Sequence, residues 1–348
     1  MIRFVCDYSE GAHPEILRRL SETNLEQTPG YGEDAYCRAA SERIRVLCAC
    51  PEAGVHFLVG GTQVNLTVIA SVLRPWQGVV CADTGHIQVH ETGAIEATGH
   101  KVLALAGREG KISAEDIRRC MEAHWGDVNH EHTVQPGMVY ISFPTELGTL
   151  YSREELKELS EACREYGLPL YADGARLGYG LATGENDVTL PDLAAFCDIF
   201  TIGGTKQGAL FGEAVVIANP ALDRDFRYGI KQRGGMLAKG RLLGIQFLAL
   251  LEKDLYFTLS QRADQLAMRI RDAFAEAGCD FLIASPTNQQ FPILTRAQEA
   301  YLSEQFSFSF WCSLPGGREA VRVCTSWATR EEDVQALLDA IKSMPAGS

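Results

Sequence analysis

The sequence predicts an α/β protein with a mostly parallel sheet and a second, smaller α+β part at the carboxyl end. Seven short apolar runs alternate with longer helical patterns, and the character of the pattern changes after about residue 235. Runs that are apolar throughout and separated by helices are typical of parallel strands covered on both faces. A chain of 348 residues is also longer than an average domain with one hydrophobic core, which favours two domains.

The predicted strands of the sheet are short apolar segments. They are Val55–Val59, Gly78–Ala82, Lys101–Leu105, Met138–Phe143, Leu168–Ala172, Ile199–Gly203 and Ala214–Ala218. Helical patterns lie between them, for example at Gly61–Arg74, Ser113–Trp125 and Ser152–Tyr166. The two segments that start with serine carry an acidic residue three positions later, which is the capping pattern of a helix start.

The last third of the chain has a different pattern. Long helical patterns at Met236–Leu251 and Thr258–Ala277 lead into a shorter α+β tail. The predicted elements of the tail are strands at Gln290–Leu294, Phe306–Trp311 and Val321–Thr325 and a final helix at Arg330–Ser343. We therefore expect an amino-terminal arm and large domain over residues 1–240, and a linking helix and small domain over residues 241–348.

Composition and charge exclude several classes of protein. With 46% hydrophobic and 22% charged residues, the chain is neither disordered nor collagenous. The 32 Lys and Arg residues are outnumbered by 45 Asp and Glu residues and form no basic stripe, so we expect no nucleic-acid partner. The longest apolar stretch, Leu242–Leu251, is too short to cross a bilayer, so we expect no membrane partner. The start, Met1–Asp7, does not fit a signal peptide, and the 11 cysteines include no Cys-x-x-Cys pair, so we expect a cytoplasmic protein.

Candidate reactive groups follow the predicted strands, because the carboxyl ends of parallel strands meet at one edge of a sheet. After the first strand, Gly60, Gly61 and Thr62 open a helix. Backbone N–H groups and a hydroxyl at a helix start can bind an anion such as phosphate. The same three residues also fit an ordinary tight turn between a strand and a helix.

Two further predicted strands end in charged residues. One is followed by Asp173 and Arg176, which fit either a functional acid with its partner or a structural ion pair. The other is followed by Thr205 and Lys206, set among glycine and alanine. Partial burial would lower the pKa of this lysine, whereas a solvated surface position is the alternative.

Two competing patterns are weaker. His86 and His90 could share one helix face and bind zinc, but no third ligand has a supporting spacing, so we expect no metal. The segment 178–184 resembles a loosened dinucleotide fingerprint, but five residues separate it from the preceding strand. Because the pyrophosphate turn follows its strand directly, we do not expect a dehydrogenase.

The order of these features resembles the layout of one class of enzyme. An anion-binding turn, a histidine, a strand ending in Asp-x-x-Arg and a lysine 33 residues after that Asp are similar to pyridoxal-phosphate enzymes with the aspartate-aminotransferase-like fold, fold type I. The chain also resembles the low-specificity L-threonine aldolases among the β-eliminating lyases. The matching motifs are Tyr31-Gly32-Glu33-Asp34, Gly60-Gly61-Thr62 with Asn65, Ala82-Asp83 through His86 to Glu91-x-Gly93-Ala94, Asp173-Gly174-Ala175-Arg176, Thr205-Lys206-x-Gly208, Gly234-Gly235-Met236 and Arg322-x-x-Thr325.

The resemblance implies pyridoxal 5′-phosphate as the cofactor and a set of residues that would hold it. Lys206 would bind it covalently through the side-chain amine, with Thr205 beside it. His86 would stack on the pyridine ring, and Asp173 would pair with the ring nitrogen and keep it protonated. The phosphate would be held by Gly60, Gly61, Thr62 and, from a neighbouring subunit, Arg233.

The resemblance also implies substrate contacts. Arg176 would lie near the hydroxyl group of the cofactor ring and near the substrate carboxylate. Arg322 would bind the substrate carboxylate through two hydrogen bonds. Tyr31 and Cys6 are further candidates for substrate contact, and Cys6 stands where better-known aldolases carry a serine. Because sites in this family are shared between subunits, a homodimer or homotetramer is implied.

One departure from the family concerns the group that takes the proton of the β-hydroxyl. After the strand that contains Met138, better-known aldolases show Asn-Thr-His, whereas this chain has Pro144-Thr145-Glu146. A carboxylate thus replaces the imidazole, and Glu146 could act as the base directly or through water. An exposed loop acid is the alternative.

Together the motifs predict a lyase that cleaves the Cα–Cβ bond of a β-hydroxy-α-amino acid, such as threonine or allo-threonine, into glycine and an aldehyde. The catalytic residues would be Lys206, His86, Asp173 and Glu146. The arginine contacts would determine which reaction occurs, because they orient the substrate. The bond that they hold perpendicular to the cofactor ring is the one that breaks. Two alternatives stay open: a β-elimination in which Lys206 removes the α-proton, and an amino-acid-binding protein without catalysis.

Overall fold

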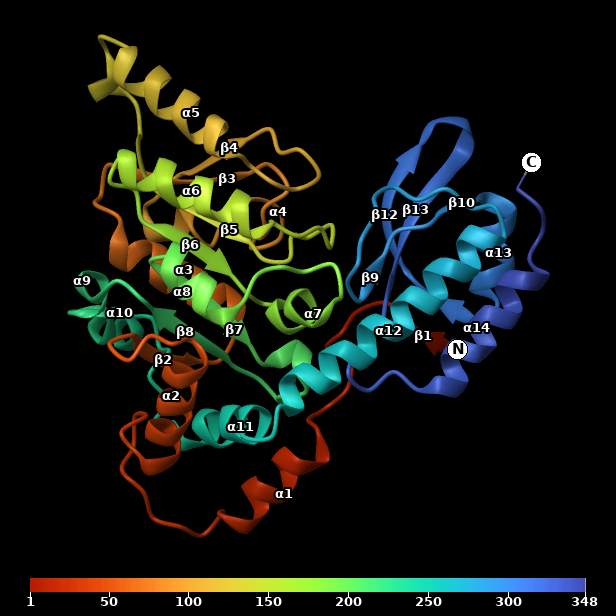
Figure 1. Ribbon diagram of the computed structural model, residues 1–348, viewed down its shortest axis with the longest axis horizontal. Coiled ribbons are helices and arrows are strands. Elements are labelled where there is room, and N and C mark those ends of the chain that lie inside the picture. The colour runs from red at the N-terminus through yellow and green to blue at the C-terminus, as the bar shows by residue number, and fades with distance from the viewer. Residues whose placement is uncertain (348) are drawn as a thin grey trace.

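The computed structural model describes residues 1–347, and these residues form a seven-stranded sheet in the larger part of the molecule (Figure 1). The strands, in chain order, are β2 (Gly54–Leu58), β3 (Gln77–Ala82), β4 (Val102–Leu105), β5 (Gln135–Ser142), β6 (Leu170–Asp173), β7 (Ile199–Gly203) and β8 (Glu213–Ile217). Their order across the sheet is β2-β8-β7-β6-β5-β3-β4, and only β8 runs antiparallel to its neighbours. The predicted mostly parallel sheet is confirmed.

Helices cover both faces of this sheet. One face packs against α3 (Gly61–Val72), α4 (His86–Val89) and α10 (Phe226–Gln232). The opposite face packs against α2 (Ala35–Leu47), α5 (Ala114–Gly126), α6 (Arg153–Glu165), α7 (Leu177–Ala182), α8 (Leu190–Phe196) and α11 (Arg241–Leu251). Neighbouring residues of β5 divide between the two cores: Tyr140 lies in the core with α3, and Ile141 lies in the core with α6. This division explains why the strands carry apolar residues on both faces.

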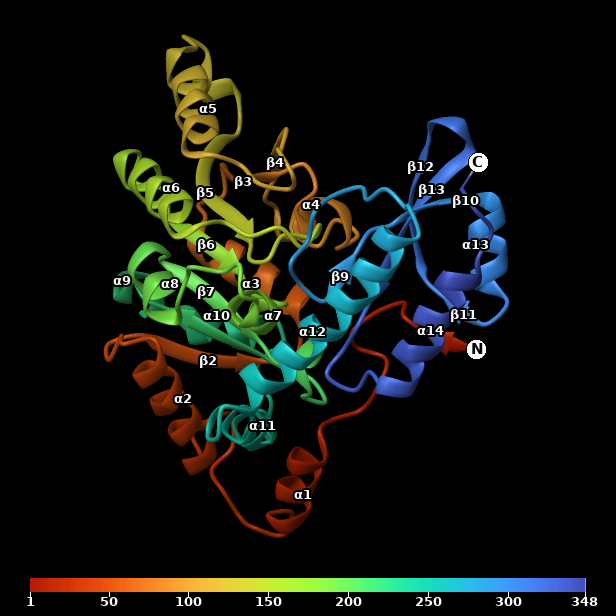
Figure 2. The same ribbon diagram turned by 45° about the vertical axis from the view of Figure 1, so that its right-hand side comes forward.

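A smaller unit follows the long helix α12 (Leu255–Glu276), which runs from the sheet towards the carboxyl end (Figures 1 and 2). Its elements are β9 (Gln289–Gln290), β10 (Ile293–Thr295), α13 (Arg296–Ser303), β11 (Phe306–Ser307), β12 (Ser309–Leu314), β13 (Arg318–Cys324) and α14 (Glu331–Ser343). A separate apolar core is formed by residues that include Phe4, Leu266, Val323 and Leu337. The division of the chain at residue 240 stays a prediction.

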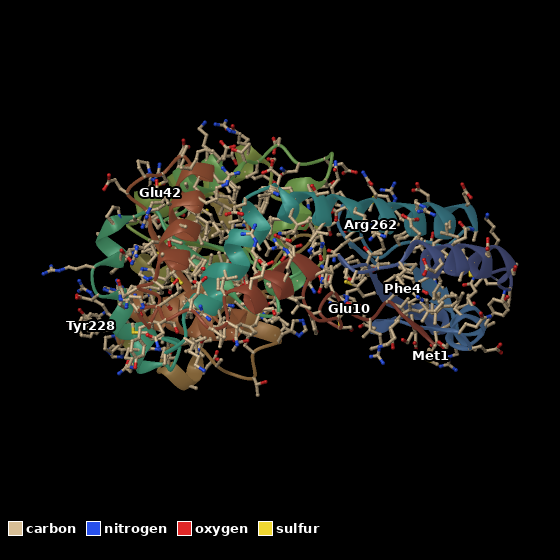
Figure 3. All side chains as sticks on the ribbon, turned by 90° about the horizontal axis from the view of Figure 1, so that it is seen from below. Met1, Phe4, Glu10, Glu42, Tyr228 and Arg262 are labelled. Carbon is tan, nitrogen blue, oxygen red and sulfur yellow. The ribbon has the colours of Figure 1, made fainter. Side chains whose placement is uncertain are left out.

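The first residues of the chain lie with the smaller unit. Strand β1 (Ile2–Arg3) pairs in parallel with β11. Figure 3 accordingly places Met1 and Phe4 towards the end opposite to Tyr228, which belongs to the larger part. The amino-terminal segment therefore connects the two parts before the chain enters α1 (Pro14–Glu22).

The predicted helix at Met236–Leu251 is wrong at its start, because α11 begins only at Arg241. The backbone of Gly240 approaches that of Gly32 so closely that a Cβ would lie 2.5 Å from its nitrogen. Residues 236–240 therefore form a loop beside the amino-terminal segment. Several helices have no counterpart among the helical stretches named from the sequence: α1, α2, α7, α8, α9 (Pro220–Asp223), α10 and α13.

The carboxyl ends of β6 and β7 lie side by side, which places Asp173 and the turn with Lys206 at the same edge of the sheet. Gly174 makes this approach possible, because a Cβ there would lie 1.9 Å from the carbonyl oxygen of Thr201. Within residues 1–347, no helix has both the length and the apolar character that crossing a membrane requires.

Candidate active site

Five of the predicted site residues line one pocket at the carboxyl edge of β5, β6 and β7. These residues are His86, Glu146, Asp173, Arg176 and Lys206. They are separated by up to 120 positions in the sequence (206 − 86), so the fold brings them together. The pocket therefore holds two carboxyl groups, an imidazole, a guanidinium and a primary amine.

Lys206 lies on a single helical turn, Thr205–Gln207, that directly follows β7. The N–H groups of Gly204 and Thr205 donate to the carbonyl oxygen of Gly212 at 2.9 and 3.2 Å, which fastens this turn to the start of β8. Burial lowers the pKa of Lys206, and the charge of Arg176 lowers it further. A lysine with a lowered pKa has a larger fraction of neutral, nucleophilic amine than a solvated one.

Asp173 is buried at the end of β6 and is held by three donors. Its Oδ2 accepts hydrogen bonds from the Tyr140 hydroxyl at 2.7 Å and from Nδ2 of Asn65 at 3.0 Å. Its Oδ1 accepts from the N–H of Ala175 at 2.9 Å. These contacts fix the orientation of the carboxyl group at the edge of the pocket.

A hydrogen-bonded network connects Asp173 to His86. Nδ2 of Asn65 also donates to Oε1 of Glu91 at 2.7 Å, and the same Glu91 oxygen lies 2.7 Å from Nδ1 of His86. Burial lowers the pKa of His86, but the hydrogen bond to Glu91 and the charge of Asp173 outweigh it, so the pKa is raised. The imidazole is therefore held in one orientation, as a ring that stacks on a cofactor requires.

Glu146 is buried, which rules out the exposed loop acid considered above. Its Oε1 accepts hydrogen bonds from the N–H of His86 at 2.8 Å and from the Ser142 hydroxyl at 2.5 Å. Burial raises the pKa of Glu146, and the hydrogen bond from Ser142 offsets this only in part. A buried carboxyl with a raised pKa is a suitable general base near neutral pH.

Arg176 forms a buried ion pair with Asp7 that the sequence did not reveal. Nε and Nη2 of Arg176 donate to the two carboxylate oxygens of Asp7 at 2.8 and 3.0 Å. Nδ2 of Asn288 donates to the same carboxylate at 2.9 Å. Burial raises the pKa of Asp7, but the charges of Arg176 and Lys206 outweigh it and lower the pKa to about 2.

We expect the substitution Asp7→Asn to lower the free energy of unfolding by about 3–5 kcal/mol, because it leaves the Arg176 charge buried without its partner. The pKa of Asp7 lies below its usual value of 3.8, at about 2, so the carboxylate stabilises the fold above about pH 4 and stops doing so as the pH falls through 2. Urea unfolding of both proteins at neutral pH measures the difference.

The matched control is Glu252→Gln, which removes the partner of Arg19 in a more exposed ion pair. This change should cost below about 1 kcal/mol. Equal urea midpoints for Asp7→Asn and the parent protein would show that the buried pair does not stabilise the fold.

Arg322 lies on β13 and reaches the amino-terminal segment. Its Nη2 donates to the carbonyl oxygen of Val5 at 3.1 Å, and its Nη1 donates to Oε1 of Gln289 at 3.2 Å. Cys6, the next residue along the chain, lies with Sγ 3.1 Å from the Ser9 hydroxyl. Neither Arg322 nor Cys6 lines the pocket of Lys206, so their contact with a substrate stays a proposal.

Gly60, Gly61 and Thr62 form the start of α3 as predicted. A Cβ placed on either glycine would meet no described atom within 4 Å, so the space around this helix start is open. An open helix start with free N–H groups fits a phosphate. Nε2 of Gln63, in the first turn, donates to the carbonyl oxygen of Arg233 at 3.3 Å, so Arg233 lies beside the same helix.

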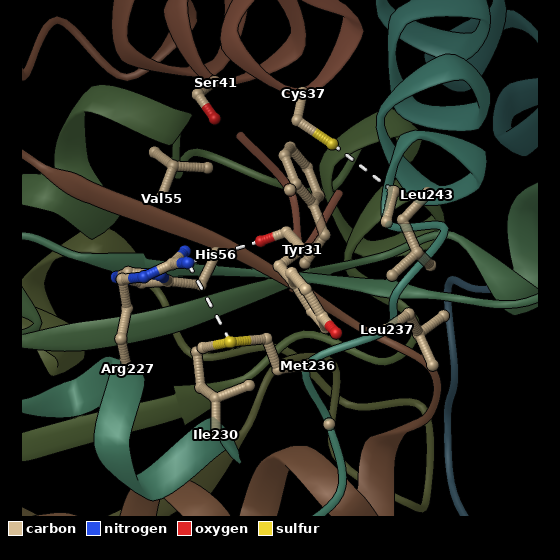
Figure 4. Close-up of a pocket in the computed structure, with 14 residues that line it drawn as sticks. Tyr31, Cys37, Ser41, Val55, His56, Arg227, Ile230, Met236, Leu237 and Leu243 are labelled. Atoms are coloured by element: carbon tan, nitrogen blue, oxygen red, sulfur yellow. Dashed lines mark hydrogen bonds between the residues drawn. The ribbon is translucent and has the colours of Figure 1, made fainter. Parts of the chain in front are cut away.

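Tyr31 lies in a different pocket, together with His56, Arg227 and Met236 (Figure 4). Its backbone has a φ of 60°, and its carbonyl oxygen accepts a hydrogen bond from Arg227 at 3.3 Å. None of the residues that line this pocket lines the pocket of Lys206. Within a single chain, the structure therefore does not bring Tyr31 to the candidate site.

The His86–His90 pattern does not form part of a larger ligand cluster. The two rings lie 5.4 Å apart between centroids, and Nδ1 of His86 is engaged by Glu91. Over residues 1–347, no group of three or more His, Cys, Asp or Glu side chains is arranged to hold a metal ion.

The fold and the site together define a pyridoxal-phosphate-dependent enzyme of fold type I. A buried lysine follows β7, an acid held by three donors ends β6, and an open helix start lies at α3. These residues fit the aldehyde, the ring nitrogen and the phosphate of the cofactor respectively.

Comparison with known proteins identifies the family. Residues 5–297 match the family model of the β-eliminating lyases. The low specificity L-threonine aldolase of Pseudomonas aeruginosa is 30% identical over 96% of this chain and 95% of its own length. A solved structure of threonine aldolase from Leishmania major is 43% identical, covers 99% of both chains and superposes with a TM-score of 0.96. The chain belongs to the β-eliminating lyase family.

Family membership confirms the resemblance, the lyase class and pyridoxal phosphate as the cofactor. It also confirms the aspartate-aminotransferase-like fold. A variant of the Thermus thermophilus aspartate aminotransferase matches with a TM-score of 0.70 at 15% identity, covering 99% of this chain and 91% of that one, which shows a shared fold.

Proposed function

We propose that the protein cleaves the Cα–Cβ bond of threonine or allo-threonine and releases glycine and acetaldehyde. The observation that carries this proposal is the position of Glu146, a buried carboxyl in the same pocket as Lys206. A base in that pocket suits a substrate whose β-hydroxyl must lose a proton as the bond breaks. The similarity to threonine aldolases from Pseudomonas aeruginosa and Leishmania major supports the choice of substrate.

Each side chain has a distinct part in this reaction. Lys206 would hold the cofactor through its side-chain amine. When bound, pyridoxal phosphate accepts the electron pair that bond cleavage leaves at Cα. Asp173 holds the proton on the ring nitrogen, and Arg176 and Arg322 orient the carboxylate so that the Cα–Cβ bond is the one that breaks.

Glu146 takes the proton of the β-hydroxyl. Its Oε1 already accepts hydrogen bonds from the N–H of His86 and from Ser142, so we assign the proton to Oε2. His86, whose imidazole is held by Glu91, is the other candidate for this proton.

Product analysis tests the function. The protein is incubated with threonine, with allo-threonine and, as a control without a β-hydroxyl, with alanine. Acetaldehyde without 2-oxobutyrate supports bond cleavage between Cα and Cβ. The reverse result supports β-elimination, and a protein whose spectrum does not respond to glycine supports binding without catalysis.

We expect Glu146→Gln to lower kcat for threonine by about 10²–10⁴-fold, the usual contribution of a general base. Because the pKa of Glu146 is raised and the base must be deprotonated, the rate of the parent should rise with pH through a range above that of an ordinary carboxyl. The variant should lack this rise. Both are measured as acetaldehyde release between about pH 5 and 9.

Glu158→Gln, which neutralises an exposed acid of α6, is the control and should retain the parent profile. If Glu146→Gln keeps both the parent rate and the rise of the rate with pH, then His86 and not Glu146 is the base.

We also propose a homodimer or homotetramer in which Tyr31 and Arg233 approach the site of a second copy. Tyr31 is 47% exposed, and the neighbouring Tyr228 is 79% exposed, so this face presents aromatic side chains to the outside of the chain. Sedimentation measures the assembly, and a monomer would contradict the proposal.

We further propose a cytoplasmic location. The 11 cysteines are free thiols in the part of the chain that the structure describes, which suits a reducing compartment. Cell fractionation tests this proposal.

A further inference from the structure

Ser142 is the last residue of β5 and lines the same pocket as Lys206 and Glu146. Its backbone pairs in register with Asp173 on β6, so the sheet holds the serine in place. Glu146 lies four residues further along the chain, in a turn outside any helix or strand. A glutamate on such a turn has several rotatable bonds, so contacts from elsewhere must fix its carboxyl group.

The hydroxyl of Ser142 makes such a contact. It donates to Oε1 of Glu146 at 2.5 Å, the length of a short hydrogen bond to a charged group. The backbone N–H of His86 donates to the same oxygen at 2.8 Å. Within residues 1–347, Ser142 is the only side chain that hydrogen-bonds this carboxyl group. Both donors therefore fix Oε1, and Oε2 is the oxygen left for a substrate.

The hydrogen of the Ser142 hydroxyl has two acceptors within reach. Besides Glu146, its Oγ lies 3.3 Å from the hydroxyl oxygen of Tyr140, whose own hydrogen is donated to Oδ2 of Asp173 at 2.7 Å. A hydroxyl has one hydrogen to donate. The shorter contact, to a carboxylate, is the stronger one, so we assign the hydrogen to the bond with Glu146.

The other charged and titratable groups around Glu146 do not make this contact. Arg176 and Lys206 line the same pocket. Charge interactions also connect Glu146 to groups on several elements, namely His86, Asp173, Tyr140, Tyr151 and Cys81. Burial raises the pKa of Glu146, and the hydrogen bond from Ser142 is the largest of the effects that lower it. Loss of this hydroxyl would therefore act on the carboxyl group directly.

We propose that Ser142 is a positioning residue for Glu146. Its hydroxyl fixes Oε1 of the carboxylate, so that Oε2 is presented to the β-hydroxyl of the substrate. Ser142 keeps its own hydrogen throughout the reaction. This inference rests on the proposed function, because it concerns how the base is held for that reaction.

A titration of the carboxyl group itself tests the inference without measuring turnover. Infrared difference spectra of the holoenzyme without substrate record the protonated and ionised forms of Glu146 against pH, and Glu146→Gln identifies the bands. Removal of a donor from the carboxylate disfavours the ionised form, so the midpoint in Ser142→Ala should lie about 1–2 pH units above that of the parent. Ser142→Thr retains a hydroxyl and should restore the parent midpoint.

Acetaldehyde release from threonine is the second measurement. Its rise with pH should move upwards in Ser142→Ala by the same amount as the infrared midpoint. Above this rise, where the base is ionised in both proteins, kcat should fall about 10-fold, because the carboxylate is oriented less well. KM should stay near that of the parent, since Ser142 acts through Glu146 and not on the substrate.

Ser160→Ala is the matched control. Ser160 lies on α6, is 2% exposed and donates its hydroxyl hydrogen to the carbonyl oxygen of Phe196 at 2.6 Å. This variant also loses a hydrogen bond from a serine, but Ser160 does not line the pocket of Lys206. The infrared midpoint, kcat and KM should therefore stay as in the parent.

The outcomes separate this inference from the proposed function. A parent protein that releases no acetaldehyde would contradict the proposed function, and the infrared titration would still decide whether Ser142 holds Glu146. An unchanged infrared midpoint in Ser142→Ala would overturn the role of Ser142 alone, and so would a shift that Ser142→Thr does not reverse. If Ser142→Ala does not fold, Ser142→Cys decides, because its thiol is a weaker donor and an unchanged midpoint there overturns the role equally.

Discussion

The substitution Lys206→Ala is expected to reduce acetaldehyde release from threonine by at least about 10³-fold, because no other described amine lines the pocket. The variant should also lose the absorption band of the covalently bound cofactor, since that bond requires Nζ. Both results follow from the position of Lys206 after β7, among the side chains of Asp173, Glu146 and Arg176. Acetaldehyde assays and absorption spectra of the purified proteins measure them.

Lys253→Ala serves as the control for this experiment. Lys253 lies on the exposed turn between α11 and α12 and does not line the pocket of Lys206. Its removal should leave both the rate and the spectrum unchanged. Turnover by Lys206→Ala at the parent rate would refute the covalent role of this lysine and with it the proposed reaction.

The substitution Asp173→Asn is expected to lower kcat by roughly 10²–10³-fold. Loss of an opposite charge beside a base lowers its pKa by about 1–3 units, and each unit is a tenfold change in the protonated fraction. The ring nitrogen would then lose its proton near neutral pH. The amide keeps the shape of the side chain and can still accept from Tyr140 and Asn65, so the fold should be retained.

The rates and cofactor spectra of Asp173→Asn are compared with those of Asp272→Asn, an exposed acid of α12. The control should behave as the parent does. If Asp173→Asn retains full activity, the pairing of this acid with the ring nitrogen is disproved.

The sheet could be predicted because burial on both faces leaves a clear sign in the sequence. Tyr140 and Ile141 face opposite cores, so apolar residues follow one another along the strand that contains them. The start of α11 could not be predicted, because it depends on the contact between Gly240 and Gly32, which are distant in sequence. Local patterns carry no information about such contacts.

The same distinction applies to the site. Asp173 and Lys206 could be named because each directly follows a predicted strand, and the ends of parallel strands meet. Asp7 was missed because its partner, Arg176, is 169 residues away and the pair exists only in the folded chain.

The amino-terminal segment acts as a mechanical tether between the two parts of the molecule. Strand β1 is anchored on β11, and a few residues later Asp7 clamps Arg176 at the wall of the lysine pocket. A displacement of the carboxyl-terminal unit would therefore shift Asp7 and, through its ion pair, the side chain of Arg176. The placement of the guanidinium would thereby depend on the placement of the carboxyl-terminal unit.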